Sequence, residues 1–138
     1  MHIACPHCGT VNRVPAERTA DNPDCGRCGR PLLPGEPVAV DDEQLAALVG
    51  KTELPVLLDV WAPWCGPCRM MAPQFEAAAE RLKGKVVFAK LDSDAHPESS
   101  ARLGIRSIPT LILFEGGREV RRQSGALGAA QIVQFAAG

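Results

Sequence analysis

Six cysteines are the residues of this chain whose type and spacing most directly suggest chemistry. They form three Cys-x-x-Cys pairs: Cys5 with Cys8, Cys25 with Cys28, and Cys65 with Cys68. Two intervening residues let both sulfurs point at one spot, so each pair can bind a metal or form a reversible disulfide. A secreted chain would favour three disulfides, whereas a reducing compartment favours metal binding or redox catalysis.

The first two pairs have the spacing of a zinc site with four thiolate ligands. Sixteen residues separate Cys8 from Cys25, and a glycine that can adopt positive φ directly follows each pair, at Gly9 and Gly29. We therefore expect one structural Zn²⁺ held by Cys5, Cys8, Cys25 and Cys28, because a closed tetrahedron leaves no position for water. Two disulfides, or four free thiols, are the alternatives. His7 is expected to be an exposed bystander.

The third pair lies in a different context, between a buried strand and a long helix. The unpaired N–H groups at a helix N-terminus favour a thiolate. We expect Cys65 to be exposed at the tip as the nucleophile and Cys68 to resolve the mixed disulfide. A permanent disulfide would close too small a loop to stabilise the chain much, and no further zinc ligands stand at a suitable spacing.

Two charged residues in apolar strands complete the candidate catalytic set. Asp59 is the one acidic residue in an otherwise apolar segment, where burial should raise its pKa and suit it to accept the proton of Cys68. Lys90 lies in a neighbouring apolar segment and can share a proton or charge with Asp59. The alternative for Lys90 is an ordinary lysine at the end of a strand.

These residues must be positioned by alternating strands and helices. The patterning predicts a mixed sheet with helices on both sides, and hence an α/β fold. The expected strands are 38–40, 55–61, 85–91, 110–114 and 119–123, the last two joined by a turn at Gly116-Gly117. The expected helices are 41–49, 65–82 with a kink at Pro73, 97–103 and 128–136.

The composition divides the chain near residue 37. Residues 1–36 contain no aromatic residue and five prolines, and residues 31–37 read as a short stiff linker. A piece this small usually needs a metal or disulfides to fold. We therefore predict a zinc-binding module with its linker at 1–36 and a second domain at 37–138.

The charge and hydropathy exclude several functional classes. The formal net charge is −1, and four thiolates with one Zn²⁺ make it −3, so we expect no nucleic-acid partner. The apolar runs, residues 55–58 among them, are far too short to cross a bilayer, and we expect no membrane association. The N-terminus has no visible secretory signal, so we expect a cytoplasmic protein.

A set of residues along the second domain matches one known family. The set comprises Asp59, residues 61–69, Pro73, residues 90–92, residues 104–110, Gly116-Gly117 and Gly125. With these features the second domain resembles the thioredoxin family over essentially all of residues 37–138, and with the cysteine-rich module in front the chain resembles the zinc-containing thioredoxin 2 type of bacteria. The resemblance implies a thioredoxin fold, a central mixed sheet flanked by helices, behind a small zinc-ribbon-like module.

The resemblance also implies further roles. Pro109 matches the cis-proline that lies against the active-site cysteines, and the backbone of Ile108 would pair with an extended substrate. The flat docking surface would comprise Trp64, Gly66, Pro67, Ile108, Pro109 and Gly125. The implied partners are proteins with disulfides and, as electron donor, an NADPH-dependent thioredoxin reductase. A monomer without a bound organic cofactor is expected.

The function that these features predict is reduction of protein disulfides by thiol-disulfide exchange. A second hypothesis is a zinc-dependent binding or chaperone module on the same scaffold. A third, compatible with the first, is a redox sensor in which oxidation of the zinc thiolates ejects the metal.

Overall fold

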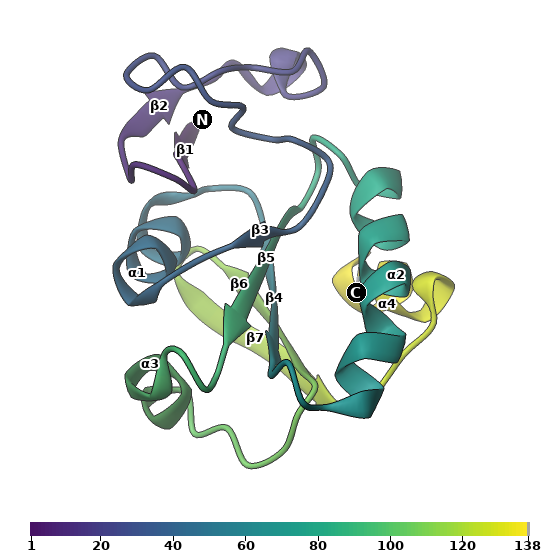
Figure 1. The fold of residues 1–138 in the computed structure, drawn as a ribbon. Helices are drawn as coiled ribbons and strands as arrows, with labels where there is room; N and C mark the ends of the chain where they lie inside the picture. Colours follow the sequence, from purple (N-terminus) through teal and green to yellow (C-terminus); the bar gives the residue numbers. More distant parts are fainter. Residues whose placement is uncertain (138) are drawn as a thin grey trace.

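The computed structural model describes residues 1–137, which form a small N-terminal hairpin module followed by a sheet with helices on both faces (Figure 1). The module contains β1 (His2–Ala4), β2 (Val11–Arg13) and a short 3₁₀ helix (Ala16–Arg18). The strands of the main sheet are β3 (Val38–Ala39), β4 (Val56–Trp61), β5 (Val87–Asp92), β6 (Thr110–Glu115) and β7 (Arg118–Ser124). The helices are α1 (Asp42–Lys51), α2 (Gly66–Arg81), α3 (Pro97–Arg102) and α4 (Ala129–Ala137).

The main sheet is mixed, as the sequence pattern predicts. Its strand order is β3-β5-β4-β6-β7, in which β3, β5 and β4 are parallel, β6 is antiparallel to β4, and β7 is antiparallel to β6. Helices α1 and α3 cover one face, and α2 and α4 cover the other (Figure 1). The central strand β4 is buried on both faces, which explains its continuous apolar run.

Each predicted strand and helix of the second domain is present, with ends that shift by at most two residues. Helix α2 begins at Gly66 and continues through Pro73 to Arg81. The β1–β2 hairpin and the 3₁₀ helix were not expected, because three-residue strands in a segment poor in apolar residues carry almost no periodic pattern.

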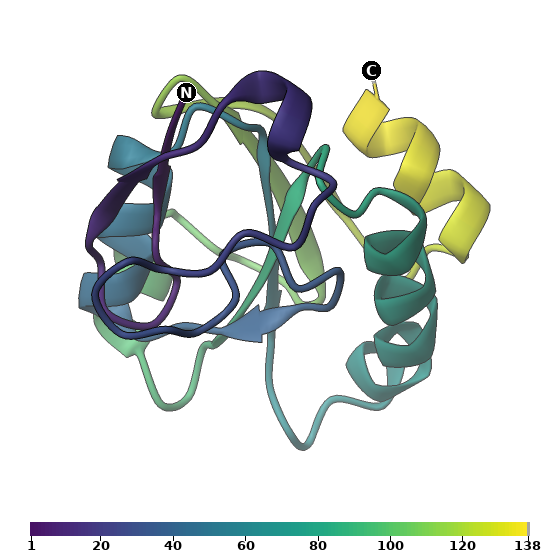
Figure 2. The same ribbon diagram turned by 90° about the horizontal axis from the view of Figure 1, so that it is seen from above.

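The N-terminal module shares its core with the sheet. Its buried side chains Ile3, Val14, Leu32 and Leu33 join a cluster that contains Leu45 and Leu48 of α1 and the residues of β4 and β5 that face them. Figure 2 shows the module lying over α1 and one part of the sheet, with α2 and α4 to the side. The module therefore gains from the sheet the apolar contacts that it cannot make alone.

Backbone contacts fix the position of the module. The N–H of Glu53 donates to His2 O at 2.9 Å, and the N–H of Ala4 donates to the buried Thr52 Oγ1 at 3.1 Å. Gly84, in the turn before β5, approaches the module so closely that a Cβ atom there would lie 2.9 Å from Thr19 O. Its φ is also positive, at 78°, so glycine is required at this position for two reasons.

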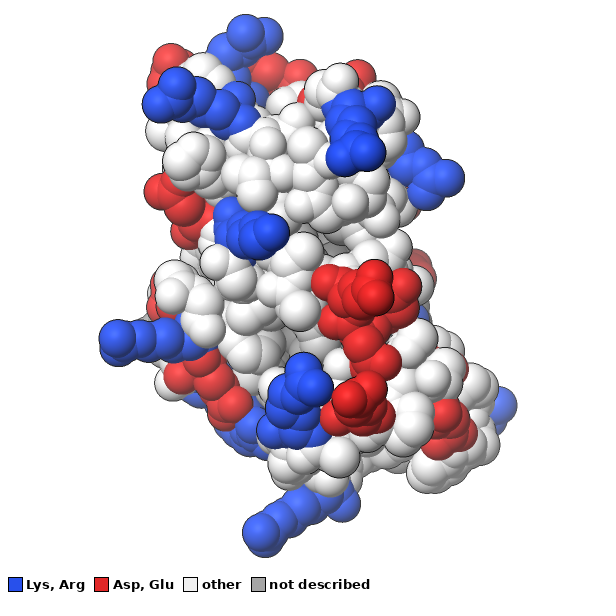
Figure 3. All heavy atoms as spheres, turned by 90° about the vertical axis from the view of Figure 1, so that its left-hand side faces the viewer, with Lys and Arg blue, Asp and Glu red and all other residues white. Residues whose placement is uncertain are grey.

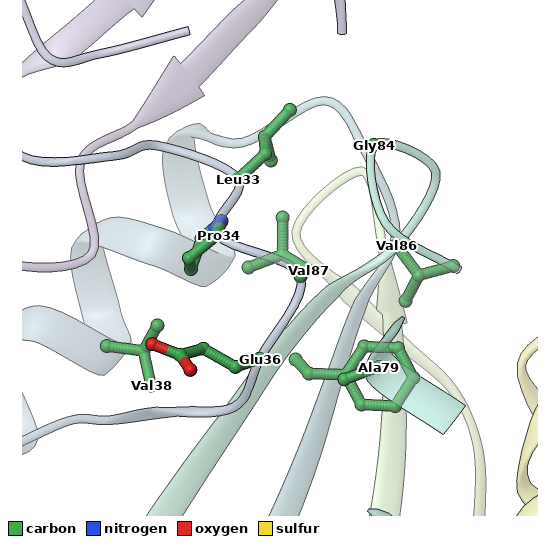
Figure 4. Close-up of a pocket in the computed structure, with 10 residues that line it drawn as sticks. Leu33, Pro34, Glu36, Val38, Ala79, Gly84, Val86 and Val87 are labelled. Carbon is green, nitrogen blue, oxygen red and sulfur yellow. The ribbon is translucent and has the colours of Figure 1, made fainter. Parts of the chain in front are cut away.

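The linker is packed against the sheet rather than free in solvent. Leu33 is buried, and Figure 4 shows Leu33 and Pro34 beside Val87 at the start of β5 and near the Gly84 turn. The cavity between these segments measures about 10 Å³, which is at the lower limit for a single water molecule. The linker therefore forms part of the contact between the module and the sheet.

Gln44 joins the module to the start of α1. Its Oε1 accepts from the N–H of Asp41, and the Asp41 carboxylate accepts from the N–H of Gln44, which completes a capping box. Its Nε2 also donates to His7 O at 3.0 Å, inside the loop between Cys5 and Cys8. One side chain thus caps the helix and holds the cysteine loop.

Gln44→Glu is expected to separate these two roles. Glutamate preserves the capping box but places a carboxylate against His7 O, so the free energy of unfolding should fall by about 1 kcal/mol. Hydrogen exchange should accelerate mainly in residues 5–10, whereas Gln44→Ala, the matched control, should also loosen the first turn of α1. Equal exchange in wild type and Gln44→Glu would contradict a stabilising contact with His7.

Candidate functional site

The redox-active pair is a disulfide at the N-terminus of α2. Cys65 is the N-cap of the helix and is joined to Cys68 in its first turn. The N–H of Cys68 donates to Cys65 Sγ at 3.2 Å, so a free backbone donor of the helix end points at this sulfur. Figure 1 places this end of α2 at the carboxyl end of β4, opposite the N-terminal module.

The disulfide is more deeply buried than the sequence suggested. Cys65 is only 4% exposed, so the expectation of an exposed thiol at the tip is wrong for this oxidised state. The side chain packs with Ala62, Trp61 and Ile108, and its sulfur lies 3.8 Å from Ile108 O. The loop that ends at Pro109 is distant from Cys65 in the sequence. The residues around Cys65 therefore could not indicate how deeply this loop would bury its sulfur.

Asp59 has the environment that the sequence predicted. It is 1% exposed on β4, and its Oδ1 has no hydrogen-bond partner among residues 1–137. Burial raises the pKa of this carboxyl to about 7, although the positive charge of Lys90 acts in the opposite direction. A carboxyl that titrates near neutral pH can both accept and return a proton under working conditions.

Lys90 is placed beside Asp59 by the pairing of two parallel strands. The register of β4 and β5 puts the two residues opposite each other. The Nζ of Lys90 lies 4.4 Å from the centroid of the Trp61 ring, which gives the ammonium group a cation–π contact. This contact with Trp61 explains why Lys90 is partly buried. Lys90 lies within β5, so the alternative of an ordinary lysine at the end of a strand does not describe it.

Loops from distant parts of the chain meet around the disulfide. Trp64 is 68% exposed, and its Nε1 donates to Asp94 Oδ2 at 2.7 Å in the loop after β5. The peptide bond between Ile108 and Pro109 is cis, as the resemblance implied, and the N–H of Gly125 donates to Pro109 O at 2.9 Å.

The predicted docking residues therefore belong to the first turn of α2 and to loops that the structure brings near it. Gly66 and Pro67 lie between the two cysteines, and Pro67 is exposed. Sequence reasoning missed Asp94, since a carboxylate in a polar loop gives no sign that it contacts an indole.

The other four cysteines converge within the N-terminal module. Their sulfurs all lie within 4.8 Å of one another, and the pairs Cys5–Cys28 and Cys8–Cys25 are each 3.6 Å apart. Four sulfurs bound to one zinc at about 2.3 Å would be about 3.8 Å apart, so the arrangement fits a tetrahedral zinc site. None of the four forms a disulfide, and the sulfur pairs at 3.6 Å are too far apart for an S–S bond of about 2.05 Å, so the alternative of two disulfides does not fit. His7 is not part of this set and contacts Arg30 instead.

The local backbone explains why the four sulfurs converge. Gly9 and Gly29 both have φ of 77°, as predicted, and their N–H groups close the two loops onto Cys5 O and Cys25 O. Burial raises the pKa of the Cys5 thiol to about 12, whereas hydrogen bonds from the Cys28 backbone and Asn12 lower the pKa of Cys25 to about 6. The residues can thus hold a metal ion, provided that it displaces the proton from Cys5.

Comparisons with known proteins agree with this geometry. The family model for thioredoxin matches residues 36–138, and the model for the N-terminal region of thioredoxin 2 matches residues 4–30. The chain belongs to the thioredoxin family. Thioredoxin C-3 of Corynebacterium nephridii is 47% identical over 135 residues, which cover 98% of this chain and 92% of that protein.

Two further comparisons extend the likeness. The bifunctional thioredoxin reductase/thioredoxin of Mycobacterium leprae is 43% identical over 100 residues, or 72% of this chain and 22% of that longer protein. The crystal structure of a chloroplastic thioredoxin z superposes with a TM-score of 0.69 at 31% identity, covering 74% of this chain and 92% of that one. The fold of the second domain is therefore the thioredoxin fold.

Membership of the thioredoxin family and the Cys65–Cys68 disulfide together assign the chemistry. The protein is a thiol-disulfide oxidoreductase with disulfide reductase activity. The N-terminal module is a zinc ribbon with four cysteines positioned to bind a metal ion.

Proposed function

We propose that Cys65 attacks the disulfide of a protein substrate and that Cys68 releases the product. The observation that supports these roles is the place of Cys65 as N-cap of α2, where the N–H of Cys68 donates to its sulfur. No acidic residue stands in the first turn of α2 to oppose a negative sulfur. A thiolate is therefore favoured at Cys65 in the reduced protein.

The reaction transfers two electrons in two exchanges. First, the Cys65 thiolate bonds to one substrate sulfur, the substrate disulfide breaks, and the other substrate sulfur leaves as a thiolate that takes a proton from water. Next, Cys68 loses its proton to Asp59 and attacks the sulfur of Cys65. The mixed disulfide breaks, the second substrate thiolate departs, and the Cys65–Cys68 disulfide remains.

Asp59 and Lys90 are the proposed proton-handling residues. A buried carboxyl with a pKa near 7 is half ionised at neutral pH, which suits the general base for Cys68. Lys90 lies opposite it in the strand register and favours its ionised form. We assign Lys90 the role of limiting how far burial raises the pKa of Asp59.

The substrate surface that we propose combines the start of α2 with the loops around the disulfide. Trp64, Gly66 and Pro67 supply one side, and Ile108, Pro109 and Gly125 the other. The carbonyl of Ile108 near Cys65 can pair with an extended peptide, which would align a substrate disulfide with the attacking sulfur.

Thioredoxin reductase is the proposed electron donor for the Cys65–Cys68 disulfide. The fused reductase and thioredoxin of Mycobacterium leprae supports this pairing, because that protein joins both activities in one chain. The test is insulin reduction in the presence of NADPH and a purified bacterial thioredoxin reductase. We expect NADPH oxidation to depend on this protein, and turnover with dithiothreitol but none with any reductase would contradict the assigned donor.

We further propose that the module at 1–36 holds one structural Zn²⁺ ahead of a catalytic domain at 37–138. When bound, zinc would cross-link the loops that carry Cys5, Cys8, Cys25 and Cys28. The four free thiols support a reducing location such as the cytoplasm. None of the helices in residues 1–137 has the length and apolar character needed to cross a membrane.

We propose that the protein is a monomer and that it does not bind nucleic acid. Figure 3 shows that basic and acidic side chains are interspersed on the face formed by the module, α1 and α3. Such a surface has no broad positive field to attract a phosphate backbone.

Asp59→Asn is expected to stabilise the oxidised protein above neutral pH. The folded-state pKa of about 7 exceeds the ordinary value of 3.8, so the folded protein binds more protons than the unfolded chain between these values. Wild-type stability should therefore fall as pH rises from 4 to 7, by a few kcal/mol, and then level off. Asn carries no charge, so the stability of the variant should not fall over this pH range. Guanidinium unfolding at pH 5 and pH 8 measures the difference.

The same variant tests the catalytic role of Asp59. Decay of a preformed mixed disulfide should slow by about tenfold or more, and its dependence on pH near 7 should flatten. Ser99→Ala replaces another buried polar residue away from the disulfide and serves as the control. Parallel pH profiles in Asp59→Asn and wild type would exclude Asp59 as the base.

A further inference from the structure

Asn12 lies between the two cysteine loops of the metal site. It is the middle residue of β2, and its Nδ2 donates to Thr10 O at 3.0 Å and to Cys25 Sγ at 3.5 Å. Its Oδ1 accepts from the N–H of Gly26 at 2.9 Å. Thr10 ends the loop that carries Cys5 and Cys8, and Gly26 belongs to the loop of Cys25 and Cys28, so one carboxamide contacts both loops.

The orientation of this carboxamide follows from its partners. The Thr10 carbonyl and a thiolate at Cys25 can only accept hydrogen bonds, whereas the N–H of Gly26 can only donate. The amide nitrogen must therefore face the sulfur, and the amide oxygen must face Gly26. A flipped amide would lose all three interactions.

The contact with Cys25 differs in kind from the other N–H contacts to these sulfurs. Cys5 Sγ accepts from the N–H of Cys8, and Cys25 Sγ accepts from the N–H of Arg27, both of which are backbone groups. Asn12 supplies a side-chain nitrogen to the same Cys25 sulfur. Donors of this kind withdraw negative charge from a thiolate and fix its direction, which matters because four thiolates around Zn²⁺ leave a net charge of −2.

We propose that Asn12 is a positioning residue of the metal site, which clamps the two cysteine loops together and donates a hydrogen bond to the Cys25 thiolate. The proposal rests on the proposed function of the module as a zinc site. Residues that orient metal ligands in this way typically contribute about 10–100-fold to metal affinity. Asn12 is not one of the four converging cysteines, so its effect passes through Thr10, Cys25 and Gly26.

Two substitutions distinguish this role from simple packing. Asn12→Asp keeps the shape of the side chain and an acceptor for Gly26, but it replaces the donor with a carboxylate oxygen facing Cys25. Asn12→Ala removes every contact of the carboxamide without adding charge. Arg13→Ala, at the next position of β2 with its side chain exposed, is the matched control.

The measurements are made on the full-length protein. Zinc affinity is determined by competition with a chromophoric chelator, and the cobalt-substituted protein reports the thiolate-to-cobalt charge-transfer band. We expect affinity to fall about 10-fold in Asn12→Ala and closer to 100-fold in Asn12→Asp, with a red-shifted band in both. Arg13→Ala should match wild type. Insulin reduction should stay at the wild-type rate in all three, which confirms that the catalytic domain of each variant is folded.

The test depends on which of the two variants, Asn12→Ala or Asn12→Asp, loses more zinc affinity. If Asn12 only fills space, the nearly isosteric aspartate should be the milder change and the band should not move, and that result would overturn the proposal. Wild-type affinity in both variants would overturn it while leaving the zinc assignment intact. A wild-type protein that binds no zinc would instead refute the proposed metal site, and with it the role of Asn12.

Discussion

Cys65→Ser is expected to abolish reduction of insulin by this protein, with a loss of at least about 10³-fold. A serine hydroxyl is not ionised at neutral pH, whereas the thiolate is the nucleophile in disulfide exchange. The helix-terminal N–H that stabilises a negative Cys65 sulfur cannot compensate, because it contributes only a small fraction of the energy needed to ionise a hydroxyl. The measurement is insulin precipitation with dithiothreitol or with NADPH and thioredoxin reductase.

Cys68→Ser should fail at a later step and leave a different product. The first exchange needs only Cys65, so the variant should accumulate a mixed disulfide between Cys65 and its substrate. Non-reducing electrophoresis followed by mass spectrometry should detect this adduct at Cys65. The two variants are controls for each other, because Cys65→Ser should trap nothing.

Particular results would refute these assignments. Full turnover by either serine variant would exclude the two-cysteine mechanism. An adduct on Cys68 in Cys65→Ser, with turnover retained, would mean that the roles of the two cysteines are reversed. The N-cap position of Cys65, where the N–H of Cys68 donates to its sulfur, argues for Cys65 as the nucleophile.

Removal of the metal should unfold the N-terminal module while disulfide reduction persists. Zinc contributes an apparent free energy on the order of 10–16 kcal/mol to small four-ligand modules, so residues 1–36 should lose their order when it is chelated. Ile3, Leu32 and Leu33 would then leave the shared core and uncover Leu45 and Leu48 of α1. The remaining domain should lose a few kcal/mol of stability through this exposure.

Hydrogen exchange and insulin reduction, measured on the same chelated sample, test this prediction. Amides of residues 1–36 should become unprotected, and α1 should exchange faster than α4, which lies on the other face of the sheet. Reductase activity at 25 °C should stay within about twofold of the metal-bound protein, because the module lies at the opposite end of the sheet from Cys65. The control sample receives the chelator already saturated with zinc.

The same experiment separates the remaining hypotheses about the module. Activity that falls in proportion to the zinc removed would favour a zinc-dependent binding function over a structural one. Unchanged protection of residues 1–36 would show that apolar contacts with α1 hold the module without metal. Zinc release by mild peroxide, accompanied by altered activity, would support a sensor as an added role.

Much of the candidate site could be predicted because its chemistry is local in the chain. The two residues between Cys65 and Cys68 place both sulfurs within one turn of α2, and the spacing of the other four cysteines is typical of a zinc site. Asp59 was identifiable because a carboxylate is out of place in an apolar strand. The continuous apolar runs of β4 and β5 likewise predicted a sheet covered on both faces.

The chain alone therefore determined which cysteines are paired for metal and which for redox chemistry, because spacing along the backbone decides which sulfurs can meet. The tertiary structure alone decided what surrounds them. It buries Cys65 under Ile108, sets Trp64 against Asp94, and docks the module on α1 through Gln44 and a shared core. These contacts join residues 30 or more positions apart, and only the packing of strands and helices brings them within reach.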